Sequence, residues 1–395
     1  MNLPPIARPL HTIAARYTAV VVGSGYGAGV AAARLARAGQ SVCVLERGRE
    51  ILPGQFPDGL ASARADMQID TARGRLGAGD GLYNLHLNDD MLAMVGCGLG
   101  GTSLINANVA LEVDPRHFAT EAWPQPFRED PGLLAPYVER ARQMLAPTPY
   151  PEHFPRLNKL EALRKSAQVL RQPFSRPPIT VNFENQTNPF GVPQPACTLC
   201  GDCTSGCNVG AKNTTRMNYL PDAHAHGAQI FTGARVRHVA REGQGWRVFF
   251  EAVALRGADD SAPGADRPSV PDSVYADLVL LGAGTLGSTE ILLRSREQGL
   301  ALSDRLGQRF SGNGDVLALG FDADWDPQPA TGDGQDLRRN INGVGAGTNP
   351  VPKDQLPGPC ITGLIDMRAT PELAEGLVIE EGVIPGALAT LLTPA

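Results

Sequence analysis

The 395-residue sequence lacks the marks of membrane, secreted and nucleic-acid-binding proteins. It has no run of about 18 apolar residues, and its first 17 residues contain neither an apolar core nor a cleavage site, so we expect no membrane span and no secretory signal. Lys and Arg number 35 against 41 Asp and Glu, which leaves no basic excess to neutralise a phosphate backbone. These absences predict a cytoplasmic globular protein without a nucleic-acid partner.

Histidine is absent from a large part of the chain, because residues 239–395 contain none. The sequence also has no G-x-S-x-G elbow, the turn that presents the nucleophile of many Ser-His-Asp hydrolases. His224 and His226 lie beside Gly227, where we expect them to cap a helix rather than to bind a metal. Hydrolase chemistry is therefore disfavoured.

Cysteine is too sparse and too unevenly placed for a disulfide framework. Of seven Cys, four form a C-x2-C-x2-C-x3-C run, while Cys43, Cys97 and Cys360 stand apart. The members of the run are Cys197, Cys200, Cys203 and Cys207. This spacing is that of bacterial ferredoxins and favours an iron–sulfur cluster, with a zinc site or a vestigial, empty site as the alternatives. Cys207 or a remote thiol (Cys97 or Cys360) would close the cluster, unless it holds three irons.

Glycine, by contrast, is in surplus at 45 residues, and the surplus lies in specific turns. The first turn, residues 23–29, follows an apolar strand at 17–22. A helix at 30–38 and a second strand at 41–45 come after it. The order of strand, glycine turn, helix and strand is typical of a nucleotide-binding unit.

The turn has the G-x-G-x-x-A arrangement of a dinucleotide-binding site. Gly23 permits the tight turn, Gly25 lets the backbone approach a pyrophosphate, and Ala28 allows the helix to pack closely on the strand. Glu46 ends the second strand, where a carboxylate accepts hydrogen bonds from both ribose hydroxyls of an adenosine. The pattern predicts dinucleotide binding and makes NADP the least favoured ligand.

Two further segments repeat parts of this pattern. Residues 96–101 are a second glycine cluster, which suits an anion or a ring edge with Asn106 or Asn108 as polar partner. A structural loop is an equal alternative there. Residues 276–296 again read as strand, glycine turn and helix. The repetition predicts one nucleotide-binding sheet assembled from separated segments.

The rest of the chain gives weaker signals. Helices are expected at residues 133–144 and 157–170, and an antiparallel meander at 228–250. Residues 50–95 are mixed and turn-rich, and residues 257–272 have the composition of an exposed loop.

Three stretches together resemble the glucose-methanol-choline (GMC) flavoprotein oxidoreductases, and among them the bacterial cholesterol-oxidase-like members. They are VVVGSGYGAGVAAARLARAGQSVCVLERG, VGCGLGGTSLINANVAL, and LGAGTLGSTEILLRSR with SDRLGQRFSGNGD. The resemblance implies an α/β fold in which a Rossmann-like FAD-binding domain is assembled from separated segments. The implied parts are an FAD-binding domain (15–110 and 225–318), an inserted Cys-rich segment (111–224) and an incomplete substrate-binding domain (319–395).

The resemblance also implies cofactor contacts. Those expected at the FAD pyrophosphate and ribose are Gly23, Gly25, Tyr26, Gly27 and Glu46. Those expected along the flavin are Gly101, Thr102, Asn106 and Val109, with Val236 at the adenine and Gly284 on the second strand-turn-helix unit. Thr102 stands where the family commonly has Gly, and Asn106-Ala107-Asn108 replaces a frequent Asn-Gly-Gly, so the contacts at the flavin edge are expected to differ.

The activity implied by the resemblance is oxidation of the CH–OH group of a sterol-like or other apolar alcohol. The family takes the hydroxyl proton with a C-terminal His while hydride passes to the flavin. Because no His follows His238, we expect a C-terminally truncated chain without its catalytic base, which binds FAD weakly and turns over little. A four-iron (4Fe–4S) or three-iron (3Fe–4S) cluster at the Cys run would relay electrons to an acceptor protein or quinone.

Three alternatives stay open at this point. A non-catalytic electron-transfer flavoprotein would share the motifs but would need no substrate pocket. An NAD-dependent dehydrogenase would have no use for the second glycine cluster. A zinc-stabilised protein with a degenerate nucleotide fold would use the Cys run alone.

Overall fold

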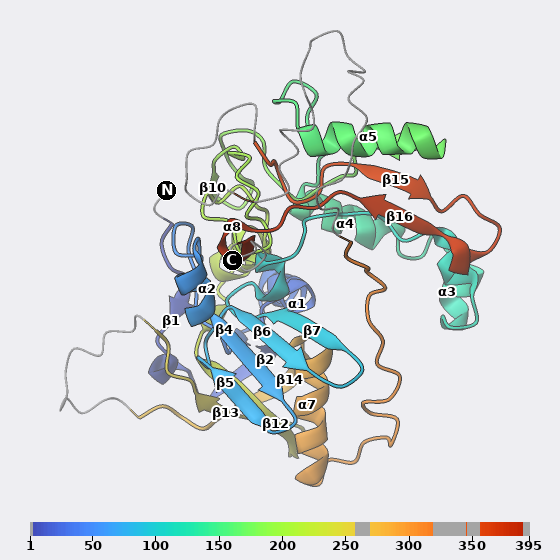
Figure 1. Ribbon diagram of the computed structural model, residues 1–395. Helices are drawn as coiled ribbons and strands as arrows, with labels where there is room; N and C mark the ends of the chain where they lie inside the picture. Colours follow the sequence, from blue (N-terminus) through green and yellow to red (C-terminus); the bar gives the residue numbers. More distant parts are fainter. Residues whose placement is uncertain (1–2, 257–268, 319–344, 346–355, 390–395) are drawn as a thin grey trace.

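A seven-stranded sheet forms the centre of the computed structural model, which describes residues 3–256, 269–318, 345 and 356–389. The strand order is β1-β11-β3-β2-β14-β13-β12 (Figure 1). The strands are β1 (Ala7–Arg8), β2 (Arg16–Val22), β3 (Val42–Leu45), β11 (Gln229–Phe231), β12 (Ala234–Glu242), β13 (Gly245–Ala252) and β14 (Ser273–Leu281). Strands far apart in the sequence are thus neighbours in one sheet.

The first five strands in this order pair in parallel, and β13 and β12 add an antiparallel pair beside β14. Val20 and Val21 of β2 are fully buried, as expected for a parallel strand that is covered on both faces. The predicted α/β fold, with a nucleotide-binding sheet assembled from separated segments, is confirmed.

The meander predicted at residues 228–250 is only partly correct. β12 and β13 form an antiparallel pair, but β11 leaves it and pairs in parallel with β3. Ile230 and Phe231 of β11 are both fully buried. A strand of three residues is too short for its pattern to distinguish alternation from burial on both faces.

Helices cover both faces of the sheet. α1 (Tyr26–Arg37) and α6 (Tyr219–Ala225) lie on one face, and α7 (Gly284–Glu297) lies on the other. α1 begins four residues before the expected start at residue 30, so it includes two glycines of the turn. A Cβ on Gly29 would lie 3.2 Å from the Cβ of Tyr219, so this glycine lets α1 and α6 pack closely. His226 caps the C-terminus of α6, as expected.

A second, four-stranded sheet occupies the region that we expected to be turn-rich. Its order is β5-β4-β6-β7, and it follows the short helix α2 (Leu60–Ala65). Its strands are β4 (Met67–Thr71), β5 (Gly74–Gly77), β6 (Tyr83–Leu87) and β7 (Leu92–Gly96). Its strands do not place apolar side chains inside and polar side chains outside. Leu76 and Leu92 are 64% and 61% exposed, while Gln68 and Asn84 are buried. A reading that places apolar residues inside therefore misses this sheet.

The inserted segment contains the two helices that the sequence predicts, α4 (Ala135–Leu145) and α5 (Asn158–Leu170). The C-terminal strands β15 (Leu364–Met367) and β16 (Leu377–Glu380) join β8 (Phe174–Ser175) of that segment in a three-stranded sheet. The remaining elements are α3 (Gln125–Glu129), β9 (Gln186–Thr187), β10 (Pro193–Gln194) and α8 (Gly386–Ala389). Residues 319–344 and 346–355 of the expected substrate domain, and most of the predicted loop, lie outside the described residues. Within the described part, no helix is both long and apolar enough to cross a membrane.

Gly282 offers a test of the contact between the sheet and α1. A Cβ there would lie 2.7 Å from the Cβ of Ala28, so Gly282→Ala should lower the free energy of unfolding by about 1–3 kcal/mol through overpacking. Gly382→Ala is the control, because a Cβ at Gly382 meets no atom within 4 Å. Denaturant titration of both variants checks this, and equal stability would contradict the contact.

Candidate functional site

The first glycine turn has one packed side and one open side. Gly23 has φ 93°, and a Cβ there would lie 2.5 Å from the carbonyl oxygen of Gly282, so this glycine is required by the packing of β2 beside β14. Gly25 caps the N-terminus of α1, and a Cβ on Gly25 or Gly27 would meet no atom within 4 Å. The backbone at the start of α1 therefore faces open space, as a phosphate-binding helix N-terminus requires.

The second glycine cluster packs against this turn. A Cβ on Gly101 would lie 2.9 Å from the Cα of Gly25. The hydroxyl of Ser24 accepts a hydrogen bond from the N–H of Gly100 at 2.9 Å, and Ser24 is buried. The hydroxyl of Thr215 donates to the carbonyl of Ser24 at 3.0 Å. The two glycine turns and the segment around Thr215 thus meet at the carboxyl end of β2. The sequence identifies the two turns as candidates but not Thr215.

Glu46 lies beside this junction, at the end of β3. Its carboxylate accepts a hydrogen bond from the Ser24 hydroxyl at 2.5 Å and another from the N–H of Gly48 at 2.8 Å. Burial raises the pKa of this carboxyl above 4.5. Each oxygen retains a lone pair, so the carboxylate is still able to accept the ribose hydroxyls expected from the sequence.

Two asparagines of the loop that follows the second glycine cluster (residues 102–109) have unpaired amide atoms. The amide of Asn106 donates to the hydroxyl of Tyr26 at 2.9 Å, but its oxygen is buried without a partner. Asn108 is 1% exposed with φ 74°, and neither atom of its amide has a partner. Buried polar groups are nearly always hydrogen-bonded, so these atoms indicate a further polar partner, and Asn106 places one of them beside Tyr26 of α1.

The other candidate residues are distributed around this junction. The hydroxyl of Thr102 accepts from the N–H of Gly96 at 3.1 Å, and Val109 bridges to Ile179 of the inserted segment. Gly284 begins α7, and a Cβ there would meet no atom within 4 Å. The side chain of Val236 is buried in the core between the sheet and α7, so any contact with a ligand would come from its backbone.

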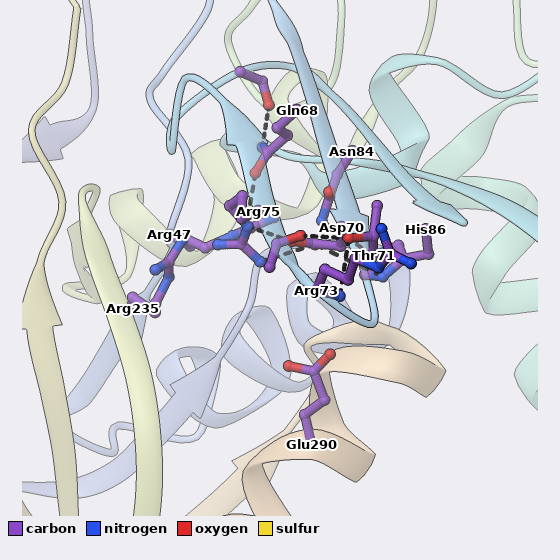
Figure 2. A network of polar contacts seen from close by, with 12 residues as sticks. Arg47, Gln68, Asp70, Thr71, Arg73, Arg75, Asn84, His86, Arg235 and Glu290 are labelled. Atoms are coloured by element: carbon purple, nitrogen blue, oxygen red, sulfur yellow. Dashed lines mark hydrogen bonds and ion pairs between the residues drawn. The ribbon is translucent and has the colours of Figure 1, made fainter. Parts of the chain in front are cut away.

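A polar network on the inner face of the four-stranded sheet connects it to this region (Figure 2). Arg75 and Asp70 form an ion pair at 2.8 Å, and Glu290 of α7 points toward them. Arg47, next to the expected ribose ligand, donates to the side-chain oxygen of Gln68 at 3.1 Å. The small sheet is therefore attached to the nucleotide-binding sheet by polar contacts.

All four thiols of the Cys run line one small cavity in the inserted segment. Burial raises the pKa of Cys203 to about 12 and that of Cys200 to about 11. Within the described residues, no group of three or more His, Cys, Asp or Glu side chains is arranged to hold a metal ion. The four Cys residues thus share one cavity, and the described residues support neither a zinc ion nor an iron centre beyond that.

Lys212, which the sequence did not single out, lines the same cavity. It is 2% exposed, and its ammonium donates to the carbonyl oxygens of Cys203, Leu104 and Asn106 at 2.9, 3.1 and 2.7 Å. Burial lowers the pKa of Lys212 to about 8. No motif marks this residue, because two of its three partners come from a loop more than 100 residues away.

Comparison with known proteins adds independent findings. Residues 19–311 match the family described as GMC oxidoreductase. A cholesterol oxidase of Mycobacterium tuberculosis is 30% identical over 74% of this chain and 50% of its own length, and a long-chain-alcohol oxidase of Arabidopsis thaliana is 31% identical over 56% and 26%. The solved pyridoxine 4-oxidase from Mesorbium loti aligns over 70% of this chain and 51% of its own, with a TM-score of 0.43 and 16% identity. The chain thus spans half or less of the length of these curated relatives.

Glu46→Gln tests the buried carboxylate through the pH dependence of stability. Because burial raises the pKa of Glu46, the folded wild type binds its proton more tightly than the unfolded chain and loses stability as pH rises through that pKa. The Gln variant lacks this loss, so its unfolding free energy relative to wild type should increase as pH rises above about 4.5, the ordinary pKa of Glu, and level off once the carboxyl is ionised in the folded wild type. Denaturant titrations at several pH values, with the exposed Glu251→Gln as control, measure the difference. A pH-independent difference would contradict the assignment.

Proposed function

The chain belongs to the GMC oxidoreductase family, and on that premise we propose that it binds FAD and takes part in oxidising the CH–OH group of an apolar alcohol. The observation that carries the proposal is the set of unpaired amide atoms on Asn106 and Asn108 beside the open start of α1. The pyrimidine edge of a flavin alternates donors and acceptors, and these amides offer both.

The residues of the junction suit the other parts of FAD. The N–H groups at Gly25 and Gly27 would hold the pyrophosphate, because a Cβ at either position would meet only open space. Glu46 would accept the ribose hydroxyls. When bound, the flavin supplies a hydride acceptor, and this chain's residues orient it and exclude water from its edge.

The substrate class rests on the relatives. One is named a cholesterol oxidase and another a long-chain-alcohol oxidase, and both names indicate apolar alcohols. We propose the same class for this chain and assign no catalytic base among its residues. The cytoplasmic location and a protein or quinone electron acceptor stay predictions.

We further propose that the Cys run holds a four- or three-iron cluster, which would supply one-electron transfer. Two observations support this. The residues of the Cys run all line one cavity, and their C-x2-C-x2-C-x3-C spacing is that of bacterial ferredoxins.

Flavin occupancy tests the first proposal. The purified chain should contain FAD, seen as visible flavin absorbance and released by denaturation. Gly27→Leu places a side chain in the open space at the start of α1, so the affinity for FAD should fall at least about tenfold while the apoprotein stays folded. Arg34→Leu adds the same side chain on the exposed side of α1 and is the control.

The alcohol proposal is tested on the same preparation without oxygen. A long-chain alcohol or a sterol should bleach the bound flavin faster than glucose does. A wild-type chain without flavin, or Gly27→Leu with undiminished flavin, would contradict the cofactor site. Flavin that glucose bleaches as fast as, or faster than, the long-chain alcohol and the sterol would contradict the substrate class.

Metal analysis after anaerobic purification tests the cluster. We expect three or four irons and as much acid-labile sulfide per chain, and their loss in Cys200→Ser. Cys43→Ser is the matched control, because Cys43 is buried in β3 outside the cavity. Equimolar zinc without iron or sulfide would contradict the proposal.

A further inference from the structure

Three cationic side chains are buried in the described part of the chain, those of Lys159, Lys212 and Arg216. Lys159 forms an ion pair with Glu381 at 2.8 Å, and Arg216 forms one with Glu50 at 2.6 Å. Pairing of this kind offsets the cost of removing a charge from water.

Lys212 differs from the other two because its three partners are carbonyl oxygens. Carbonyl dipoles lower the cost of burying an ammonium but bring no compensating charge. Asp202 also lines the cavity, and its carboxylate accepts a hydrogen bond from the N–H of Gly386 at 2.7 Å. The remaining ionisable groups that line the cavity with Lys212 are the four thiols of the Cys run.

We propose that Lys212 is the counter-charge of an anionic metal–thiolate centre held by Cys197, Cys200, Cys203 and Cys207. This inference rests on the proposed cluster. Four thiolates outweigh the positive charge of an iron–sulfur core, so the loaded centre is anionic, and an ammonium in the same cavity stabilises it. Lys212 is thus a positioning residue and not a ligand.

Lys212 also connects the Cys run to the flavin-facing loop. Its ammonium bonds the carbonyl of Cys203 on one side and the carbonyl of Asn106 on the other. The side chain of Asn106 in turn donates to Tyr26 at the start of α1. One buried side chain therefore links the metal-binding segment to the loop that is expected to contact the flavin.

The test compares Lys212→Gln, which keeps amide donors but removes the charge, with Lys212→Arg, which keeps the charge. Full-length apoprotein is reconstituted anaerobically with ferrous iron and sulfide, and iron, sulfide and FAD per chain are measured. Lys212→Gln should bind the cluster about 10- to 100-fold more weakly, the range typical of lost outer-shell partners, and should retain FAD. Lys212→Arg should bind it within a few-fold of wild type.

Lys159→Gln is the matched control, because it removes an equally buried ammonium whose partner is a carboxylate, and it should keep its cluster. If FAD content and thermal unfolding show that Lys212→Gln does not fold, Lys212→Met is used in its place. It should also bind the cluster more weakly and retain FAD. If Lys212→Gln or Lys212→Met contained as much iron and sulfide per chain as the wild type, the proposed role of Lys212 would be wrong, while the proposed cluster would stand. A wild-type chain that takes up no iron would overturn both, while FAD content would still report on the flavin site.

Discussion

Three buried hydroxyl groups, those of Ser24, Ser103 and Thr215, hold the candidate site together. Thr215 donates to the carbonyl of Ser24 across 191 positions of sequence, and the hydroxyl of Ser103 accepts from the N–H of Thr215 at 3.1 Å. Ser24 then reaches Glu46, which ends β3. A buried donor or acceptor left unpaired costs about 1–3 kcal/mol, so each of these bonds favours one arrangement of the three segments. The open start of α1 and the position of the ribose-binding candidate both depend on that arrangement.

The sequence pattern predicts those elements of the fold whose neighbours in space are also neighbours in the sequence. The strand at β2, the turn at Gly23, the helix α1 and the strand β3 are consecutive in sequence, and their pattern states their order and the place of Glu46. β11 is different, because its three residues join the sheet through pairing with β3 and β1, both far away in the sequence. The pattern does not predict the four-stranded sheet, because its buried positions include polar Gln68 and Asn84 while apolar Leu76 is exposed.

The candidate site also contains residues that the sequence pattern predicts and residues that only the fold brings there. The sequence predicts Glu46 and the glycine turns from residue type and spacing, and it identifies Asn106 and Asn108 as polar groups near the second turn. It does not predict Lys212, because a lysine in a loop is ordinarily exposed and only the fold encloses this one among three carbonyl groups. The further segment at the site, around Thr215, is brought there by long-range packing.

The strand order also has a consequence for folding during synthesis. β2 lies between β3 and β14, and β14 ends at Leu281, long after β3 ends at Leu45. At about 5–20 residues per second, a ribosome needs on the order of 10–50 s to make the chain between these two points. For that time the hydrophobic strand β2 has one unpaired edge, which other nascent chains are able to join. Because this topology brings distant segments to one candidate site, β2 stays without its partner β14 during synthesis. In that time a chaperone or a low rate of expression would protect the first strands from aggregation.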